Sequence, residues 1–546
     1  MSKKQSKIAF YYLFLFIPIF SIAPCAYSAE IAEVLSQNRL ASSGEKLQTP
    51  FEKSSYFTKY QEMVDFLEKI AESNKNISIE EAGTSQRYNT PIYLVTIDNK
   101  KIPDDKKLKV MIIARAHGSE PAGMEAIISF VRDMACKKNS RTTNYLENFT
   151  FYIIPCLNPN GAGDALESYE KIGGFWGRSG RGNLSETDIN RDYQALKSSE
   201  ARACVGVFNR VSPDVVFDLH EFSSIPVIVT SHAWWMSDCF DILLGAGRNP
   251  DVYPPLAKYA REICDKKVFP ILKSRGTRAF YYAGPYGDLG SMKNMGVTAA
   301  DYFNLRNAMT FLIETSAYDQ GLKTLDKRLD WQQQTLMIIL DELAGNKKKV
   351  KSLVDKSREF ARERDSITLE MKTIPVNVKI NGKDSSTHTF KARVGINNKP
   401  YEWDQKIEFK DGNPDEREFL DLPGGYIVIG PHVDYINRLM LHGINVYESL
   451  KVIRSQSATI PAHVFYIPQN QESSAIIGLV LDRKAIIKNR YCLMERMLVM
   501  PVEIPVDLKN FRKIKSKDEI SGVILRFNEF MGNLMKNMGV EDKTED

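Results

Sequence analysis

Several features that would place the chain in a specialised class are scarce or missing. Cysteine accounts for seven of 546 residues, and these residues are too widely spaced for a small disulfide-stapled scaffold. The formal net charge is only +5, with no basic stripe interleaved with aromatics, so nothing in the electrostatics favours nucleic acid as a partner. No repeat of solenoid length is present. A chain this long with 43% hydrophobic residues predicts a globular protein of two or three domains.

The first 28 residues have the pattern of a secretory signal peptide. Three lysines precede an almost wholly apolar run at 8–20, and Ala26-Tyr27-Ser28 offers small residues before a cleavage point. The run is too short for a membrane span, so we expect export to the periplasm or the cell exterior, with no span left in the mature chain. Cleavage would remove the three lysines and no acidic residue, which changes the formal charge from +5 to +2 (5 − 3).

A candidate zinc site stands out in the first half of the chain. His117-Gly118-Ser119-Glu120 is followed about a hundred residues later by His220. Two imidazoles and one carboxylate leave one position of a tetrahedral Zn²⁺ open for water, which is typical of a catalytic zinc. The motif follows an apolar run at 109–116 and precedes a segment of helical spacing at 121–136, and His220 ends another apolar run. We therefore expect all three residues at carboxyl ends of strands, where open α/β sheets place their sites.

Two further segments extend this pattern. An expected strand at 149–157 runs into a turn, Asn158-Pro159-Asn160-Gly161, and then into Arg181-Gly182-Asn183 and Asp188-Ile189-Asn190-Arg191-Asp192-Tyr193. A late apolar strand at 309–313 leads into Glu314. In order and context these features resemble those of the carboxypeptidase A-like zinc metallocarboxypeptidases, over about residues 56–343. The resemblance implies a mixed open α/β sheet flanked by helices. It also implies zinc-dependent hydrolysis of the C-terminal peptide bond of peptides that carry a free terminal carboxylate.

The same resemblance assigns roles to individual residues. It implies one Zn²⁺ per chain, with His117, Glu120 and His220 as its ligands. It also implies the remaining catalytic and substrate-binding groups, which are Glu314 as general base, Arg181 as the cation that stabilises the oxyanion, and Asn190 with Arg191 as the grip on the substrate's terminal carboxylate. These assignments suit the chemistry, because a carboxylate can move the proton and arginine's fork matches a carboxylate.

Several alternatives stay open at this point. Arg178 lies in the same glycine-rich loop as Arg181 and competes with it for the oxyanion role. Tyr286 and Tyr302 both compete for the place of the family's substrate-covering tyrosine. Two other functions are a zinc deacylase of N-acyl amino acids, similar to aspartoacylase and succinylglutamate desuccinylase, and an inactive member that only binds. The oligomeric state is open as well.

The chain divides into regions by composition and periodicity. We expect a signal peptide at 1–28, a catalytic domain at 50–345, a charged helical linker at 346–372, and an accessory domain, β-rich or α+β, at 373–510. A C-terminal segment with a mobile tail follows at 511–546. Sparse apolar residues in the linker predict a solvated helix, and period-2 stretches beyond it predict strands.

Overall fold

The computed structural model of the chain describes residues 47–175, 180–185, 187–223, 240–247, 249–282, 297–316, 318–380, 383–396, 399–429, 433–454, 459–482, 484–485, 498–502 and 508–537. The predicted signal peptide and the tail from Glu541 lie outside these residues. Within them, none of the helices has both the length and the apolar character needed to cross a membrane.

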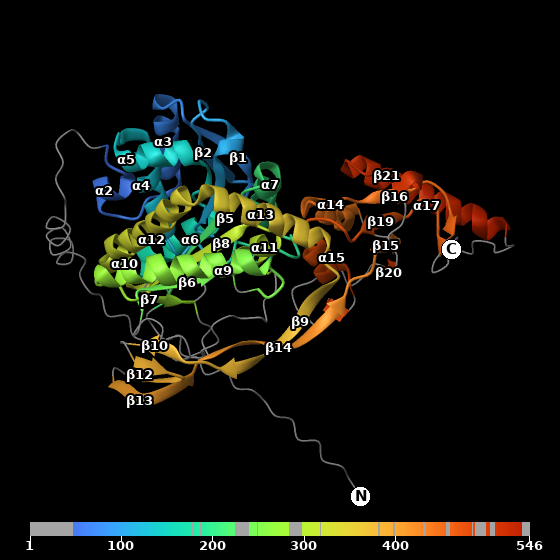
Figure 1. Ribbon diagram of the computed structural model, residues 1–546. Helices are drawn as coiled ribbons and strands as arrows, with labels where there is room; N and C mark the ends of the chain where they lie inside the picture. The colour runs from blue at the N-terminus through green and yellow to red at the C-terminus, as the bar shows by residue number, and fades with distance from the viewer. Residues whose placement is uncertain are drawn as a thin grey trace, which may run out of the picture. The chain divides into compact units, whose positions relative to one another are not determined.

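An eight-stranded mixed sheet flanked by helices underlies the candidate site (Figure 1). Its order is β1-β2-β4-β3-β5-β8-β6-β7. The central strands β4, β3, β5 and β8 pair in parallel, as do β6 and β7, and the remaining neighbours are antiparallel. The strands are β1 (Ile77–Thr84), β2 (Pro91–Ile97), β3 (Leu108–Ala114), β4 (Phe149–Ile154), β5 (Val215–Phe222), β6 (Ile242–Ala246), β7 (Ala279–Tyr281) and β8 (Met309–Ser316). The expected fold class is thus confirmed.

The four apolar runs of the sequence are the four central strands. Every residue of β5 is buried, and so are six of the seven in β3. Continuous apolar runs are typical of parallel strands, because helices cover both faces of such a sheet. The helices are α2 (Pro50–Ser54), α3 (Tyr60–Ser73), α4 (Ala122–Cys136), α5 (Ser140–Asn148), α6 (Pro159–Ile172), α7 (Ser199–Val211), α9 (Pro254–Ile263), α10 (Phe269–Ser274), α11 (Ala299–Leu305), α12 (Leu325–Gly345) and α13 (Lys347–Arg362).

The strand order places a crevice beside β3. From β3 the chain proceeds to β4 on one side, and β5 pairs with β3 on the other. Such a reversal opens a crevice at the carboxyl ends of the strands, where α/β proteins bind their ligands. The register sets Ala114 beside Leu219 and His220 beside Glu314. The sheet thereby brings segments about a hundred residues apart in the sequence together at the carboxyl ends of its central strands.

Two sequence expectations need correction. The Asn158-Pro159-Asn160-Gly161 stretch is the start of α6 rather than a free turn, with Asn158 as the N-cap and Pro159 in the first turn. The expected solvated helix after residue 346 ends at Arg362 and packs one face into the protein. Its buried residues are spaced three to four apart, as on one side of a helix: Val350, Val354, Ser357 and Ala361.

The C-terminal region contains a second, antiparallel sheet of order β20-β15-β19-β16-β21 and two-stranded ribbons. Its elements are β9 (Ser366–Pro375), β10 (Val378–Ile380), β11 (Lys383–Ser385), β12 (Thr387–Ile396), β13 (Lys399–Glu408), β14 (Lys410–Asp421), β15 (Gly425–Ile429), α14 (Val433–Leu441), β16 (Tyr447–Ser449), β17 (Ile453–Arg454), β18 (Thr459–Ile460), β19 (Phe465–Pro468), α15 (Ser474–Leu481), β20 (Leu498–Val502), β21 (Phe511–Lys513) and α17 (Lys517–Asn537). The described residues from Leu47 onward belong to one compact unit. The division into domains stays a prediction.

Candidate metal centre and active site

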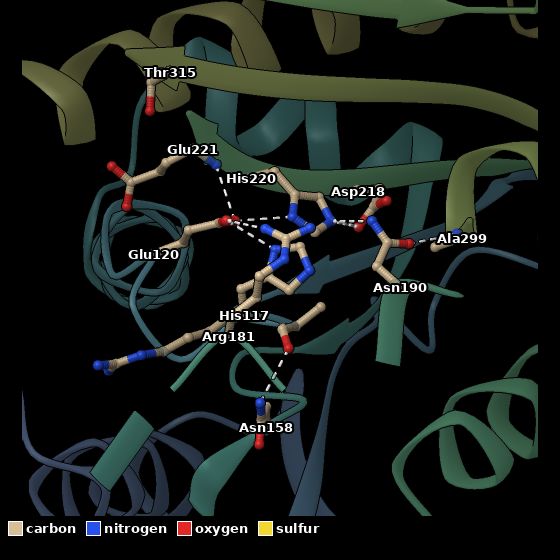
Figure 2. Close-up of polar contacts among 12 residues, drawn as sticks. His117, Glu120, Asn158, Arg181, Asn190, Asp218, His220, Glu221, Ala299 and Thr315 are labelled. Atoms are coloured by element: carbon tan, nitrogen blue, oxygen red, sulfur yellow. Dashed lines mark hydrogen bonds and ion pairs between the residues drawn. The ribbon is translucent and has the colours of Figure 1, made fainter. Parts of the chain in front are cut away.

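The three predicted ligands meet at the carboxyl ends of β3 and β5, where His117 and Glu120 follow β3 and His220 lies within β5 (Figure 2). His117 Nδ1 lies 2.8 Å from Glu120 Oε1, and His220 Nδ1 lies 2.9 Å from Glu120 Oε2. One ligand atom from each residue falls within 4.8 Å of the others, and all three side chains are buried. This group could hold a metal ion.

Each histidine has a second carboxylate at its far nitrogen. Asp188 Oδ1 lies 3.1 Å from His117 Nε2, and Asp218 Oδ1 lies 2.9 Å from His220 Nε2. Carboxylates in this position orient metal-binding imidazoles and raise their basicity. A neutral imidazole has only one N–H, yet His117 has a carboxylate at each ring nitrogen. One of these carboxylates therefore faces the lone pair of a ring nitrogen, which is unfavourable unless the ring is protonated or a cation lies between the two groups. The donor set therefore fits a cation such as Zn²⁺.

The electrostatics of the cluster point the same way. Burial would raise the pKa of Glu120, but His117 and His220 together hold it well below its usual range. Burial would lower the pKa of His220, and Asp218 and Glu120 raise it well above the ordinary value. The carboxylates of this buried cluster thus stabilise a positive charge on or between the two histidines.

Four hydrogen bonds, three of them made by the Asn158 side chain, hold the site's loops together. Gly118 N–H donates to Gly180 O at 2.6 Å. Asn158 Nδ2 donates to the carbonyls of Ala116 and Gly182 at 3.2 and 3.0 Å, and its Oδ1 accepts from Gly161 N–H. Asn158 is fully buried, so these bonds satisfy a polar side chain with no access to water. The N-cap of α6 therefore joins the ligand loop to the loop that carries Arg181.

Glycine is required where these loops touch. A Cβ on Gly118 would lie 2.0 Å from the carbonyl carbon of Gly161. Gly180 has φ +66, and its Cβ would lie 2.3 Å from Gly161 O. No side chain fits at either position without moving backbone.

Glu314 lies beside His220 on the neighbouring strand β8. Burial raises the pKa of Glu314 to about 7, with His220 opposing the rise and Glu120 adding to it. Burial also raises the pKa of Tyr282 to about 12, and the next largest influence is Glu314. Tyr282 follows β7 directly, so a third strand brings a phenol near the predicted base. Sequence reasoning did not single out Tyr282, although its place at a strand end was a usable signal.

The three residues predicted to handle substrate surround this cluster. Arg181 Nε donates to Asp188 Oδ2 at 3.2 Å, and its Nη1 lies 3.9 Å from Glu120 Oε1. Asn190 Nδ2 lies 3.1 Å from His220 Nε2, and its Oδ1 accepts from Ala299 N–H at 2.8 Å. Arg191 Nη1 donates to the carbonyl of Asn190 at 2.7 Å.

A groove of about 1010 Å³ adjoins these side chains, and Arg181, Asp188 and Arg191 form part of its lining. Space for a substrate therefore exists on the side of the cluster that carries the two arginines. Arg87 and Lys197 also line the groove, together with the carboxylates of Asp164, Asp188 and Asp192.

Glu221, which follows the ligand His220, connects the metal site to α4 and α12. Glu221 Oε1 accepts from Ala122 N–H at 2.7 Å, its Oε2 contacts Arg328, and its own N–H donates to Glu120 Oε2. Gln332, one turn after Arg328 on α12, donates to the carbonyl of His220 at 2.8 Å. The side chain of Glu221 therefore points away from the metal ligands and contacts α4 and α12 instead.

The open alternatives from the sequence fare differently. Arg178 and Tyr286 lie outside the described residues. Tyr302 is fully buried, and its hydroxyl contacts His442 and Arg306 rather than the metal cluster. Asp188 and Asp218 belong to the recognised motifs, but sequence reasoning gave them no role.

Three comparisons relate the chain to known proteins. The zinc carboxypeptidase family model matches residues 63–213. The chain is 23% identical over 400 residues to probable carboxypeptidase 2 of Trichophyton verrucosum (strain HKI 0517), with 71% of each chain covered. It is 31% identical over 110 residues to carboxypeptidase E of Caenorhabditis elegans, with 20% of this chain and 22% of that protein covered.

The solved metallo-carboxypeptidase from Pseudomonas aeruginosa aligns with a TM-score of 0.40 at 17% identity, over 54% of this chain and 70% of that one. The matched family segment includes His117, Glu120, Asn190 and Arg191. Together, the family match and the relatives confirm the resemblance seen in the sequence: residues 63–213 match the zinc carboxypeptidase domain, which is a hydrolase domain.

Proposed function

We propose that this protein is an exported zinc-dependent carboxypeptidase that removes residues from the free C-terminus of peptides. The observation that carries the proposal is the buried cluster of His117, Glu120 and His220, with Glu314 directly beside His220 on the next strand. One zinc per chain would be held by these three ligands. When bound, zinc acts as a Lewis acid and activates water for attack at neutral pH.

The protein's own residues would then divide the remaining work. Glu314 takes a proton from the attacking water and passes it to the leaving amine. Arg181 stabilises the negative charge that develops on the scissile carbonyl oxygen. Arg191, with Asn190 beside it, binds the substrate's terminal carboxylate, which sets where the chain is cut. Export rests on the pattern of residues 1–28 alone.

The substrate's C-terminus supplies a sharp test of this function. We expect the purified protein to contain one zinc per chain and to release C-terminal amino acids from free-acid peptides, as read by mass spectrometry. Amidating the same peptides removes the charge that Arg191 would bind and should nearly abolish cleavage. Comparable cleavage of acid and amide peptides would contradict the carboxypeptidase assignment, and release of an acyl group from N-acyl amino acids in its place would indicate a deacylase.

Two arginines of the groove provide matched variants. Arg191→Ala should lower kcat/KM for free-acid peptides by about 10–100-fold, because charge-assisted hydrogen bonds contribute about 1.5–3 kcal/mol. Arg87→Ala removes the same charge from the same groove. Its guanidinium donates to Leu184 O rather than to Asn190, so this variant should keep most of the activity.

A further inference from the structure

A buried histidine of the C-terminal region contacts the segment that carries the proposed carboxylate-binding residues. His442 follows α14 and is fully buried. Its Nε2 lies 3.0 Å from the backbone carbonyl of Gln194, and its Nδ1 lies 2.7 Å from the hydroxyl of Tyr302 on α11. His442 therefore contacts both the segment Asn190–Ala195 and helix α11, although it lies more than 130 residues away from each of them in the sequence.

The direction of each hydrogen bond follows from the chemistry of the partners. A carbonyl oxygen only accepts, so His442 Nε2 carries the proton and donates to Gln194 O. Nδ1 is then a lone pair and accepts from Tyr302 O–H. Arg306 Nη1 donates to the same hydroxyl oxygen at 3.0 Å. Burial, with Arg306 next in effect, lowers the pKa of His442 to about 3, so the ring stays neutral. Every polar atom of the imidazole has one partner.

Helix α11 links this histidine to Asn190 by a second route. The first residue of α11, Ala299, donates its N–H to Asn190 Oδ1 at 2.8 Å. Tyr302, in the same helical turn, hydrogen-bonds to His442, and its ring centroid lies 5.7 Å from that of Tyr193. His442 thus acts on the segment from both sides, through Gln194 directly and through α11 to Asn190.

Other contacts from the C-terminal region support the same segment. Arg438 Nη1 on α14 donates to Ala195 O at 3.2 Å. Asn209 on α7 donates to the carbonyl of Leu441 and accepts from Arg306 at 2.9 Å. A Cβ on Gly443 would lie 2.7 Å from Arg306 Nη2, so the chain after His442 packs tightly against the same group. The C-terminal region therefore contacts this segment through both close packing and specific hydrogen bonds.

We propose that His442 is a positioning residue for Asn190 and Arg191, so that the C-terminal region takes part in recognising the substrate's terminal carboxylate. This inference rests on the proposed carboxypeptidase function. It assigns the region beyond residue 430 a role in substrate selectivity rather than in stability alone. His442 touches neither the metal ligands nor the substrate, and it acts through the backbone of Gln194 and through α11.

The decisive quantity is the ratio of kcat/KM for a free-acid peptide to kcat/KM for its amide. His442→Leu removes both hydrogen bonds, and we expect this ratio to fall about 10-fold or more, the size of one weakened charge-assisted contact. The loss should appear mainly in KM of the free-acid peptide, with zinc content unchanged. His442→Gln can still donate an amide N–H to Gln194 O and should recover most of the ratio.

A histidine elsewhere in the same region serves as the control. His463 Nδ1 lies 2.9 Å from the buried Glu448, and no described contact joins it to residues 190–195. Asparagine suits the control because His463 has φ +57, a conformation that asparagine tolerates. His463→Asn should lower the unfolding midpoint and leave the acid-to-amide ratio at the parent value.

Tyr302→Phe provides an independent route, because it removes the hydroxyl that His442 accepts from and keeps the ring. We expect Tyr302→Phe to lower the acid-to-amide ratio of kcat/KM as well. If His442→Leu does not fold, the result for Tyr302→Phe tests the positioning role in its place. If both variants fold, bind zinc and keep the parent's ratio, the positioning role is overturned. If the unaltered protein itself fails to prefer acid over amide, the proposed function fails first and the inference falls with it.

Discussion

Replacing Gly118 by alanine should dismantle the metal site without altering any ligand. The added Cβ would lie 2.0 Å from Gly161 C, 2.1 Å from Gly161 O and 2.4 Å from Ala162 N. Non-bonded carbon atoms sit about 3.5–4.0 Å apart, so the ligand loop and the start of α6 would have to separate by about 1.5 Å. All three opposing atoms are backbone, and no side chain can rotate away to relieve the clash.

The size of the effect follows from this displacement. Overpacking a tight interior costs about 1–3 kcal/mol, and a backbone clash belongs at or above the top of that range. The separation would also stretch the 2.6 Å bond from Gly118 N–H to Gly180 O. Because a shift of about 1 Å in a catalytic group can cost about 100-fold in rate, we expect weaker zinc binding and activity at least that much lower.

Gly163, on the helix α6 that Gly118 contacts, is the matched control. A Cβ there meets nothing within 4 Å, so Gly163→Ala should raise the stability by about 0.5–1 kcal/mol through the higher helix propensity of alanine. The assay compares thermal unfolding, zinc per chain and peptide hydrolysis for the two variants and the parent. A Gly118→Ala protein that matches the parent in all three would refute the close-approach argument.

Three other substitutions test separate parts of the structure. Glu314→Gln keeps the shape but cannot take up the proton, so kcat should fall at least about 100-fold with zinc retained, and near-parental turnover would move the role to another carboxylate. His220→Ala should lose zinc by metal analysis, whereas full occupancy would contradict the ligand assignment. Burial raises the pKa of Glu125 from 4.5 to about 7, so the folded state binds more protons than the unfolded state between these values, and stability falls as pH rises through that window. The free energy of unfolding of Glu125→Gln should therefore rise relative to that of the parent by up to about 3 kcal/mol between pH 4.5 and 7. Thermal unfolding of both proteins across this range tests it, and a difference that does not change with pH would contradict it.

The catalytic half of the fold was predictable because its signals are local. Parallel strands covered on both faces read as continuous apolar runs. His117 and Glu120 lie in the loop that follows β3, and His220 lies in the last three residues of β5. The start of α6 also had a local signal, since asparagine followed by proline is typical of an N-cap and first helical position. Interpreting Asn158-Pro159 as a turn overlooked this.

The region after residue 345 was harder to predict for two physical reasons. The buried face of α13 is built partly from Ser357 and Ala361, whose small or polar side chains weaken the apolar periodicity. Strand β16 has only three residues, Tyr447–Ser449, which is too short for an alternating pattern to be recognised. Contacts such as His442 to Gln194 join residues 248 apart in the chain, and no local pattern encodes a pairing of that kind.

The site is assembled from segments that lie far apart in the sequence. Glu120 is held by the rings of His117 and His220 and by the backbone N–H of Glu221. His117 is oriented by Asp188 from a loop seventy residues on, and the carbonyl of His220 is held by Gln332 on α12. Since each ligand is fixed by a different segment, the cluster forms only after the sheet, α6 and α12 have packed. Binding of a cation and folding of this half of the chain are therefore thermodynamically linked.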